Sequence, residues 1–132
     1  MFSKYTFLFF ILPISLFAQN PDFRNPQGGT RFSFGVEKMR TASITSGDID
    51  ADGDADIIIA NGRHWTASNE VFLNNGKGGF TVSYDLGFYQ STSYAAEVGD
   101  LDGDGDLDIA VGNDKAPNRL FFNNGKGEFV EG

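Results

Sequence analysis

Ten aspartates are concentrated in two short stretches of the chain, residues 47–56 and 99–108, whose sequences are nearly the same. Both stretches follow the pattern Asp-x-Asp-x-Asp-Gly-Asp-x-Asp, so a carboxylate stands at every second position. Carboxylates this close repel one another by about 1 kcal/mol per pair even in water, and neither stretch contains a basic residue. A flexible, oxygen-rich loop suits Ca²⁺ better than the smaller, strictly octahedral Mg²⁺. We therefore predict one Ca²⁺ site in each stretch; the alternative is a solvated acidic turn without metal.

The start of each stretch is similar to the calcium loop of an EF-hand, which has alternating oxygen ligands and a glycine at the sharp turn. The later part differs, because the position of the final bidentate glutamate holds Ile59 in one stretch and Val111 in the other. We therefore expect each loop to join two strands rather than two helices. Asp54 and Asp106 are expected to contribute backbone carbonyls and to point their side chains outward. The expected side-chain ligands are Asp48, Asp50, Asp52 and Asp56 in the first loop and Asp100, Asp102, Asp104 and Asp108 in the second.

The chain contains an internal repeat that extends beyond these loops. Residues 47–61 align with residues 99–113, at a spacing of 52, and residues 71–80 align with residues 120–129, at a spacing of 49. The second repeat is therefore shorter by three residues, all lost between the two aligned blocks. A period near 50 residues is in the range of β-propeller blades.

Each repeat has the pattern of a meander of short strands. The apolar runs are short and rich in β-branched residues, which favours strands. The sequence Asn-Asn-Gly-Lys-Gly, at 74–78 and 123–127, is typical of a tight turn that needs positive φ angles. We predict an all-β fold of four-stranded antiparallel blades, with no helix after residue 18. The expected strands lie near 43–46, 57–60, 71–73, 80–84, 94–98, 109–111 and 120–122, with an eighth beginning near Phe129.

These residues carry a family resemblance. Residues 99–113, followed by residues 120–129, resemble the FG-GAP/VCBS repeat family, which includes the propeller head of integrin alpha subunits. The resemblance covers residues 43–132 and, more weakly, 31–37. It implies a seven-bladed β-propeller with Ca²⁺ between the first two strands of a blade, and an exported protein that binds proteins or glycans. Two blades cannot close such a ring, so we expect an N-terminal piece of a longer protein; the alternative is a short protein that assembles from several copies.

The first 18 residues have the features of a secretory signal peptide. A basic start precedes an apolar run that is short and contains Pro13, and Ala18 is a suitable residue for cleavage. We therefore expect a protein that is secreted or held at the cell surface, with no membrane span after cleavage. The expected organisation is a signal peptide at 1–18, an N-terminal segment at 19–42 with an outer strand at 31–37, repeat 1 at 43–93 and repeat 2 at 94–132.

The net charge and the lack of cysteine limit the classes of partner and the means of stabilisation that the chain can have. The chain has 18 acidic and 10 basic residues, giving a net charge of −8, and much of the acidity lies in the two loops. This charge argues against nucleic acid as a partner, because phosphates would be repelled. There is no cysteine, so no disulfide stabilises the chain. Bound cations would stabilise the folded state instead.

The sequence does not contain a recognisable catalytic constellation. It has one histidine, no cysteine and no Gly-x-Ser-x-Gly motif, so no nucleophile and base can be paired. We predict that the chain is not an enzyme but an adhesion or binding module for a protein or glycan at the cell surface or in the matrix. The alternatives are the propeller part of a larger secreted enzyme, a polysaccharide lyase or hydrolase whose catalytic residues lie outside this chain, and a two-repeat spacer.

Aromatic residues supply the remaining candidates for ligand binding. His64 and Trp65 fall in the part of repeat 1 that repeat 2 lacks, and Phe88 and Tyr89 fall in an expected connection at 86–93. On the face opposite the Asp loops, such rings could stack on a sugar or anchor a partner; the alternative is packing against a neighbouring blade. The core between blades is expected to consist of Phe32, Phe34, Phe72, Phe80, Phe121, Phe122 and Phe129.

Overall fold

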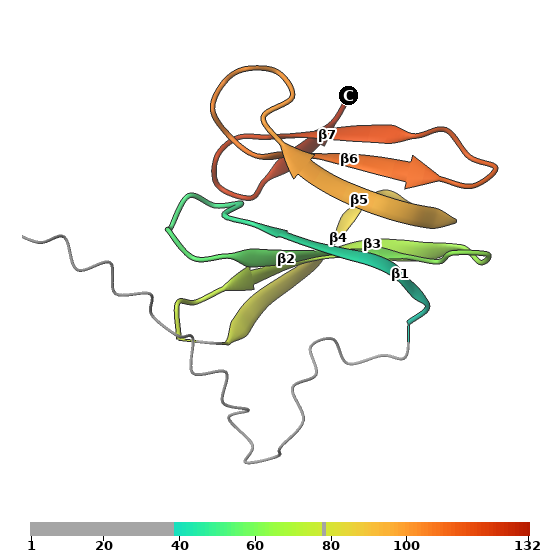
Figure 1. The fold of residues 1–132 in the computed structure, drawn as a ribbon, viewed down its shortest axis with the longest axis horizontal. Helices are drawn as coiled ribbons and strands as arrows, with labels where there is room; N and C mark the ends of the chain where they lie inside the picture. The colour runs from blue at the N-terminus through green and yellow to red at the C-terminus, as the bar shows by residue number, and fades with distance from the viewer. Residues whose placement is uncertain (1–38, 78) are drawn as a thin grey trace, which may run out of the picture.

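The computed structural model describes residues 39–77 and 79–132, which form two stacked four-stranded antiparallel sheets (Figure 1). No helix occurs in this part of the chain, and hence none long and apolar enough to cross a membrane. The predicted all-β fold of four-stranded blades is confirmed. The first sheet contains β1 (Thr41–Gly47), β2 (Asp56–Asn61), β3 (Ala67–Asn74) and β4 (Phe80–Ser91), and the second contains β5 (Ser93–Gly99), β6 (Asp108–Asn113), β7 (Arg119–Asn123) and β8 (Phe129–Glu131).

The two sheets have the same internal register where the Asp loops begin and end. Gly47 pairs with Asp56 across β1 and β2, and Gly99 pairs with Asp108 across β5 and β6. Each Asp loop is therefore the turn of the first hairpin of its sheet. Because the sheets stack, both loops lie on the same side of the molecule, at the left in Figure 1.

The core lies between the two sheets. Alternate side chains along a strand face opposite sides, and the inner positions are mostly β-branched residues or alanine. Burial of this apolar surface stabilises the fold by roughly 25 cal/mol per Å². The buried cluster contains Ile49, Ile58, Ala60, Val71 and Leu86 from the first half of the chain, and Ala96, Ile109, Val111 and Phe121 from the second.

The prediction of an aromatic core is wrong for Phe80 and Phe122. Phe121 belongs to the core and Phe129 packs against it. Phe72 follows the core residue Val71 directly, so it is buried on the other side of the first sheet. Phe80 and Phe122 are half-buried outside the core cluster. Phe32, Phe34, the expected strand at 31–37 and the expected signal peptide at 1–18 lie outside the described residues.

The expected connection at 86–93 is also wrong, because β4 continues to Ser91. Asn69 pairs with Leu86, whereas Ala67 pairs with Ser91, so β4 contains extra residues opposite β3. Such extra residues bulge out of a ladder, often at a glycine with positive φ, and Gly87 has a φ of 77°. Phe88 and Tyr89, which follow this glycine, are therefore exposed on a strand rather than on a connecting loop.

Candidate metal centres

Each Asp loop brings three carboxylates together. The two groups are Asp48, Asp50 and Asp56 in the first loop and Asp100, Asp102 and Asp108 in the second; within each, one ligand atom per residue lies within 4.8 Å of the others. We call these groups the first and second Asp triads. The curved backbone of each loop brings the first, second and last of its predicted side-chain ligands together.

The last aspartate of each triad ties its loop to the sheet. Asp56 is completely buried, and its carboxylate accepts hydrogen bonds from the backbone N–H groups of Ile49 and Asn74, both at 2.7 Å. Asp108 is equally buried and accepts from the N–H groups of Leu101 at 2.8 Å and Asn123 at 2.9 Å. Hydrogen bonds from N–H groups stabilise a buried carboxylate in its charged form. Each of these residues therefore joins its loop to the sheet and to the hairpin turn that follows β3 or β7.

The first aspartate of each triad shapes the loop. Asp48 accepts a hydrogen bond from the N–H of Gly53 at 3.1 Å. Asp100 accepts from Gly103 at 2.7 Å and from Gly105 at 3.2 Å. These glycines have φ angles between 87° and 99°, a region that other residues rarely adopt. The loop backbone thus wraps around the triad through bonds to its own carboxylates.

Asp52 and Asp104, two of the predicted ligands, lie outside the triads. Both are exposed, and each accepts a hydrogen bond at 2.9 Å from the N–H two residues further on, that of Asp54 and Asp106 respectively. This is the local turn that aspartate side chains favour. The structure therefore places these two residues in the outer curve of the loop.

We predicted that the side chains of Asp54 and Asp106 point outward, but in the structure they point toward the neighbouring hairpin turn. Both are half-buried. A Cβ atom added to Gly76 would lie 2.2 Å from Oδ2 of Asp54, and one added to Gly125 would lie 2.6 Å from Oδ2 of Asp106. The sequence signal for this direction is the glycine of Asn-Asn-Gly, which the sequence pattern explains only as a requirement of the turn. This glycine also gives the aspartate room.

Desolvation and the repulsion of neighbouring carboxylates raise the pKa of three triad residues, which are Asp50, Asp56 and Asp102. Desolvation, followed by the charge of Asp52, raises the pKa of Asp50. Desolvation also raises the pKa of Asp56, although the bonds from Asn74 and Ile49 oppose the shift. The pKa of Asp102 is raised as well, chiefly by desolvation. A nearby cation would reverse this tendency, because it favours the charged form.

The residues of the first triad fit a hard cation. Oδ1 of Asp48 and Oδ1 of Asp50 are buried and have no hydrogen-bond partner. A buried acceptor without a donor is unfavourable, and two carboxylate oxygens next to each other cannot satisfy one another. The donor set consists of oxygen alone, which Ca²⁺ and Mg²⁺ prefer to softer ligands.

Asn123 connects the two Asp loops, a role that the sequence did not reveal. Its side-chain amide donates hydrogen bonds to the carbonyl of Leu107 in the second loop, at 3.1 Å, and to the carbonyl of Ile49 in the first, at 2.7 Å. Its backbone N–H is the one that binds Asp108. The side-chain amide of Asn74, the equivalent residue of repeat 1, donates within its own repeat, to the carbonyl of Ala55 at 3.0 Å. The motif Asn-Asn-Gly-Lys-Gly therefore does more than form a turn.

The four aromatic candidates occupy two places with different neighbours. His64 lies against Tyr94, and Trp65 lies below the guanidinium of Arg40. Phe88 and Tyr89 lie on β4. Phe88 is fully exposed, and the guanidinium of Arg119 lies 5.0 Å from the centre of the Tyr89 ring, which is also exposed. The structure does not bring these residues into one site.

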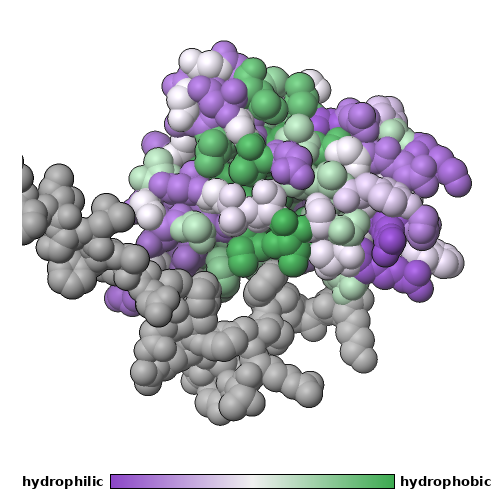
Figure 2. Space-filling view, in the orientation of Figure 1, coloured by the Kyte–Doolittle hydropathy of each residue, from purple (hydrophilic) through white to green (hydrophobic). Residues whose placement is uncertain are grey.

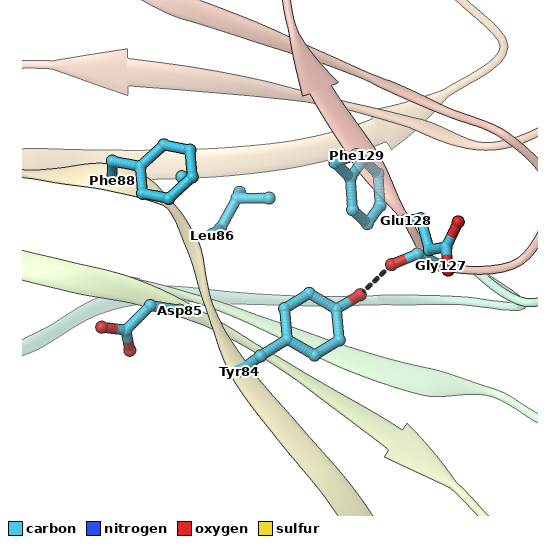
Figure 3. A pocket seen from close by; sticks show the side chains of 8 residues that line it. Tyr84, Asp85, Leu86, Phe88, Gly127, Glu128 and Phe129 are labelled. Atoms are coloured by element: carbon cyan, nitrogen blue, oxygen red, sulfur yellow. Dashed lines mark hydrogen bonds between the residues drawn. The ribbon is translucent and has the colours of Figure 1, made fainter.

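Phe88 lines a cavity of about 320 Å³ between β4 and β8 (Figure 3). Leu86 and Phe129 lie beside it, Asp85 points away, and the hydroxyl of Tyr84 donates a hydrogen bond to the carbonyl of Gly127 across the two sheets. The cavity is a gap at the outer edge of the two stacked sheets.

The chain matches a protein-family model. A model described as an FG-GAP-like repeat matches residues 48–111 and again residues 100–132. The matched segments include both Asp loops and both Asn-Asn-Gly turns. No solved structure matched the chain.

Proposed function

This chain belongs to the FG-GAP-like repeat family, and from that premise we propose that it is a calcium-stabilised binding module that acts outside the cell. The observation that carries the proposal is the pair of buried, unpartnered oxygens of Asp48 and Asp50 beside the buried Asp56. Together with a matching second triad, they provide two clusters of negative charge with no cation of the described chain among them.

We assign the ions a structural role. Asp48, Asp50 and Asp56 would hold one ion, and Asp100, Asp102 and Asp108 the other. When bound, Ca²⁺ supplies positive charge that removes the repulsion within each triad. Because Asp56 and Asp108 also bind the hairpin turns, an occupied loop would fix the end of each sheet.

The location outside the cell is supported by two features. The first is the signal-like pattern of residues 1–18. The second is the exposure of much of each loop, which is compatible with the weak, roughly 0.1–1 mM calcium affinities of extracellular modules. We further propose that the chain acts by binding a protein or glycan rather than by catalysis. In residues 39–77 and 79–132, the acidic groups that converge are those of the two triads.

Calcium titration calorimetry on the whole chain, after treatment with a chelator, tests the metal sites. We expect two Ca²⁺ per chain, with weaker binding of Mg²⁺. Asp50→Asn should weaken one site by roughly tenfold or more, and Asp102→Asn should weaken the other, because each removes one ligand charge. Asp85→Asn is the matched control, since Asp85 is exposed on β4 and outside both triads.

The proposal fails if the chain binds fewer than two Ca²⁺, or if Mg²⁺ binds more tightly. It also fails if the two triad variants bind calcium as the Asp85→Asn variant does. Circular dichroism with and without chelator gives a second measurement, because a structural ion should raise the unfolding temperature.

A further inference from the structure

A basic and aromatic cluster lies at the opposite end of the sheets from the Asp loops. Arg40 precedes β1, Arg63, His64 and Trp65 form the loop between β2 and β3, and Tyr94 is the second residue of β5. We call these five residues the basic–aromatic site. In Figure 1 the β2–β3 loop is at the right, and Figure 2 shows strongly hydrophilic side chains at this end.

The site contains a cavity of suitable size for a small ligand. Its volume is about 560 Å³, within the usual range for ligand pockets. Two of the residues that line it are arginines and one is the histidine. The lining residues are Met39, Arg40, Thr41, Arg63 and His64.

Backbone hydrogen bonds fix the loop that carries the site. The N–H of Gly62 donates to the carbonyl of Arg40 at 2.9 Å, and the N–H of Arg63 donates to the carbonyl of Ser93 at 3.1 Å. The N–H of Trp65 closes the turn on the carbonyl of Gly62 at 2.7 Å. Arg63 has a φ of 49°, an uncommon conformation for a residue other than glycine. The three segments of the site are therefore held together before any ligand binds.

Side-chain contacts position the rings and one of the charges. A ring nitrogen of His64 lies 2.7 Å from the hydroxyl of Tyr94, and the two rings meet edge to face. The guanidinium of Arg40 lies 5.1 Å from the centre of the Trp65 ring, a cation–π contact. Even so, 61% of Trp65 is exposed. A flat, accessible indole thus adjoins the charged cavity.

The arginines of the site lack acidic partners among residues 39–77 and 79–132. In the described residues, Arg119 pairs with Glu131, but neither Arg40 nor Arg63 has a carboxylate within ion-pair distance. These two guanidinium groups, which have no acidic partner in the part of the chain that the structure describes, line the same cavity of a chain with a net charge of −8. Guanidinium groups bind carboxylates and similar oxyanions with two parallel hydrogen bonds.

Comparison of the two repeats shows that the site is an addition to the common fold. Lys115 of repeat 2 is the equivalent of Arg63 and has almost the same backbone, with a φ of 58°. It is followed by Ala116 and Pro117, so repeat 2 has neither the histidine nor the tryptophan. The fold therefore does not require these side chains in the loop.

We propose that the basic–aromatic site binds an anionic saccharide. The acidic group of the sugar is held by the guanidinium groups of Arg40 and Arg63, and the pyranose ring packs on the exposed indole of Trp65. We choose a sugar over an acidic peptide because the flat apolar face of a pyranose ring matches the exposed indole in shape. This inference deepens the proposed binding function by naming a ligand class, and it does not depend on the calcium sites.

Fluorescence of the whole chain tests the proposal directly, since Trp65 is the single tryptophan. The protein, saturated with Ca²⁺, is titrated with a trisaccharide of galacturonic acid, a sulfated trisaccharide, neutral maltotriose and triglutamate. We expect saturable changes in tryptophan fluorescence with one or both acidic sugars. The acidic sugar that binds more tightly identifies the preferred acidic group as carboxylate or sulfate.

Matched variants locate the binding. Arg63→Ala and Arg40→Ala should each weaken binding by about 10- to 100-fold, the range for loss of a charge-assisted hydrogen bond. Lys115→Ala removes a positive charge from the equivalent backbone position of repeat 2, and binding should change by less than about twofold. If Arg63→Ala does not fold, Arg63→Lys keeps the charge but loses the two-pronged geometry, and binding should still weaken.

Several results would overturn the inference. These are the absence of binding by both acidic sugars, equal binding of maltotriose, tighter binding of triglutamate, or equal effects of the Arg63 and Lys115 variants. Calcium calorimetry on the same sample separates the two proposals. If the chain binds two Ca²⁺ but no acidic sugar, this inference alone is refuted. If the chain binds an acidic sugar but no Ca²⁺, only the structural role of the metal is refuted.

Discussion

At the scale of single residues, burial and the negative charge of the first Asp loop raise the pKa of Tyr84. Its hydroxyl donates a hydrogen bond to the carbonyl of Gly127 in the other sheet. Burial is the main cause that raises the pKa of Tyr84 to about 12, and the negative charges of Asp56, Asp50 and Glu128 add to it. The neutral phenol is therefore stabilised in the folded state relative to the unfolded chain.

This raised pKa predicts that the fold loses stability at alkaline pH. A group whose pKa is raised on folding contributes stability that is complete below its unfolded value, about 10, and is lost as the pH rises through about 12. Tyr84→Phe should therefore show a weaker fall in unfolding temperature across this range than the unmodified chain. The free energy of unfolding of this variant should also be lower by about 1 kcal/mol at neutral pH, because the carbonyl of Gly127 loses its hydrogen-bond donor.

Thermal unfolding followed by circular dichroism from pH 9 to pH 12 measures both effects. Tyr89→Phe is the control, since Tyr89 is exposed. Equal alkaline dependence of the two variants would contradict the role of Tyr84.

At the scale of structural elements, the two Asp loops are not independent. The hairpin turn after β7 begins at Asn123, whose amide reaches from the second loop to the carbonyl of Ile49 in the first. Asn123 is only 6% exposed, so water cannot readily replace these bonds. The order of one loop should therefore depend on the turn of the other sheet.

Substitution of Asn123 tests this dependence. Asn123→Ala leaves the carbonyls of Ile49 and Leu107 without their donor and should reduce the free energy of unfolding by roughly 1–3 kcal/mol. In a background that carries Asp102→Asn, calorimetry reports mainly the first calcium site, which we expect to weaken although Asn123 belongs to repeat 2. Asn124→Ala is the control, because the hydrogen bonds that this exposed neighbour makes with described residues stay within its own turn. Unchanged affinity of the first site in the Asn123 variant would show that the loops bind calcium separately.

At the scale of the whole molecule, the two sheets share one core and are joined at both ends. At one end the amide of Asn123 binds Ile49. At the other, the amide of Asn69 donates to the hydroxyl of Ser93 at 3.0 Å. The apolar cluster between them contains residues from both repeats. We therefore expect the described part of the chain to unfold as one unit.

Truncation of a shared core residue tests this cooperativity. Ile109 is completely buried in the cluster, and Ile109→Ala should cost about 2–5 kcal/mol through lost contacts and a residual cavity. Ile44→Ala is the control, because Ile44 is 57% exposed on β1 and surface changes are usually within about 0.5 kcal/mol. Denaturant unfolding should remain a single transition in both variants. A second transition, with repeat 1 unaffected by the Ile109 change, would contradict the shared core.

The amino-acid sequence by itself determined the elements and their order. Strands, hairpin turns and Asp loops follow from patterns of a few residues, such as β-branched runs, Asn-Asn-Gly and aspartates at every second position. The duplication of these patterns predicted two equivalent sheets, which the structure confirms. Local steric and hydrogen-bonding preferences are sufficient for these features.

Only the tertiary structure decided which side chains meet. The contact of Asn123 with Ile49 joins residues 74 positions apart, and the basic–aromatic site combines segments before β1, after β2 and within β5. The extension of β4 depends on an irregular register with β3, and the direction of Asp54 depends on the space beside Gly76. Such contacts result from the stacking and twist of whole sheets, which set distances between residues that no short sequence pattern relates.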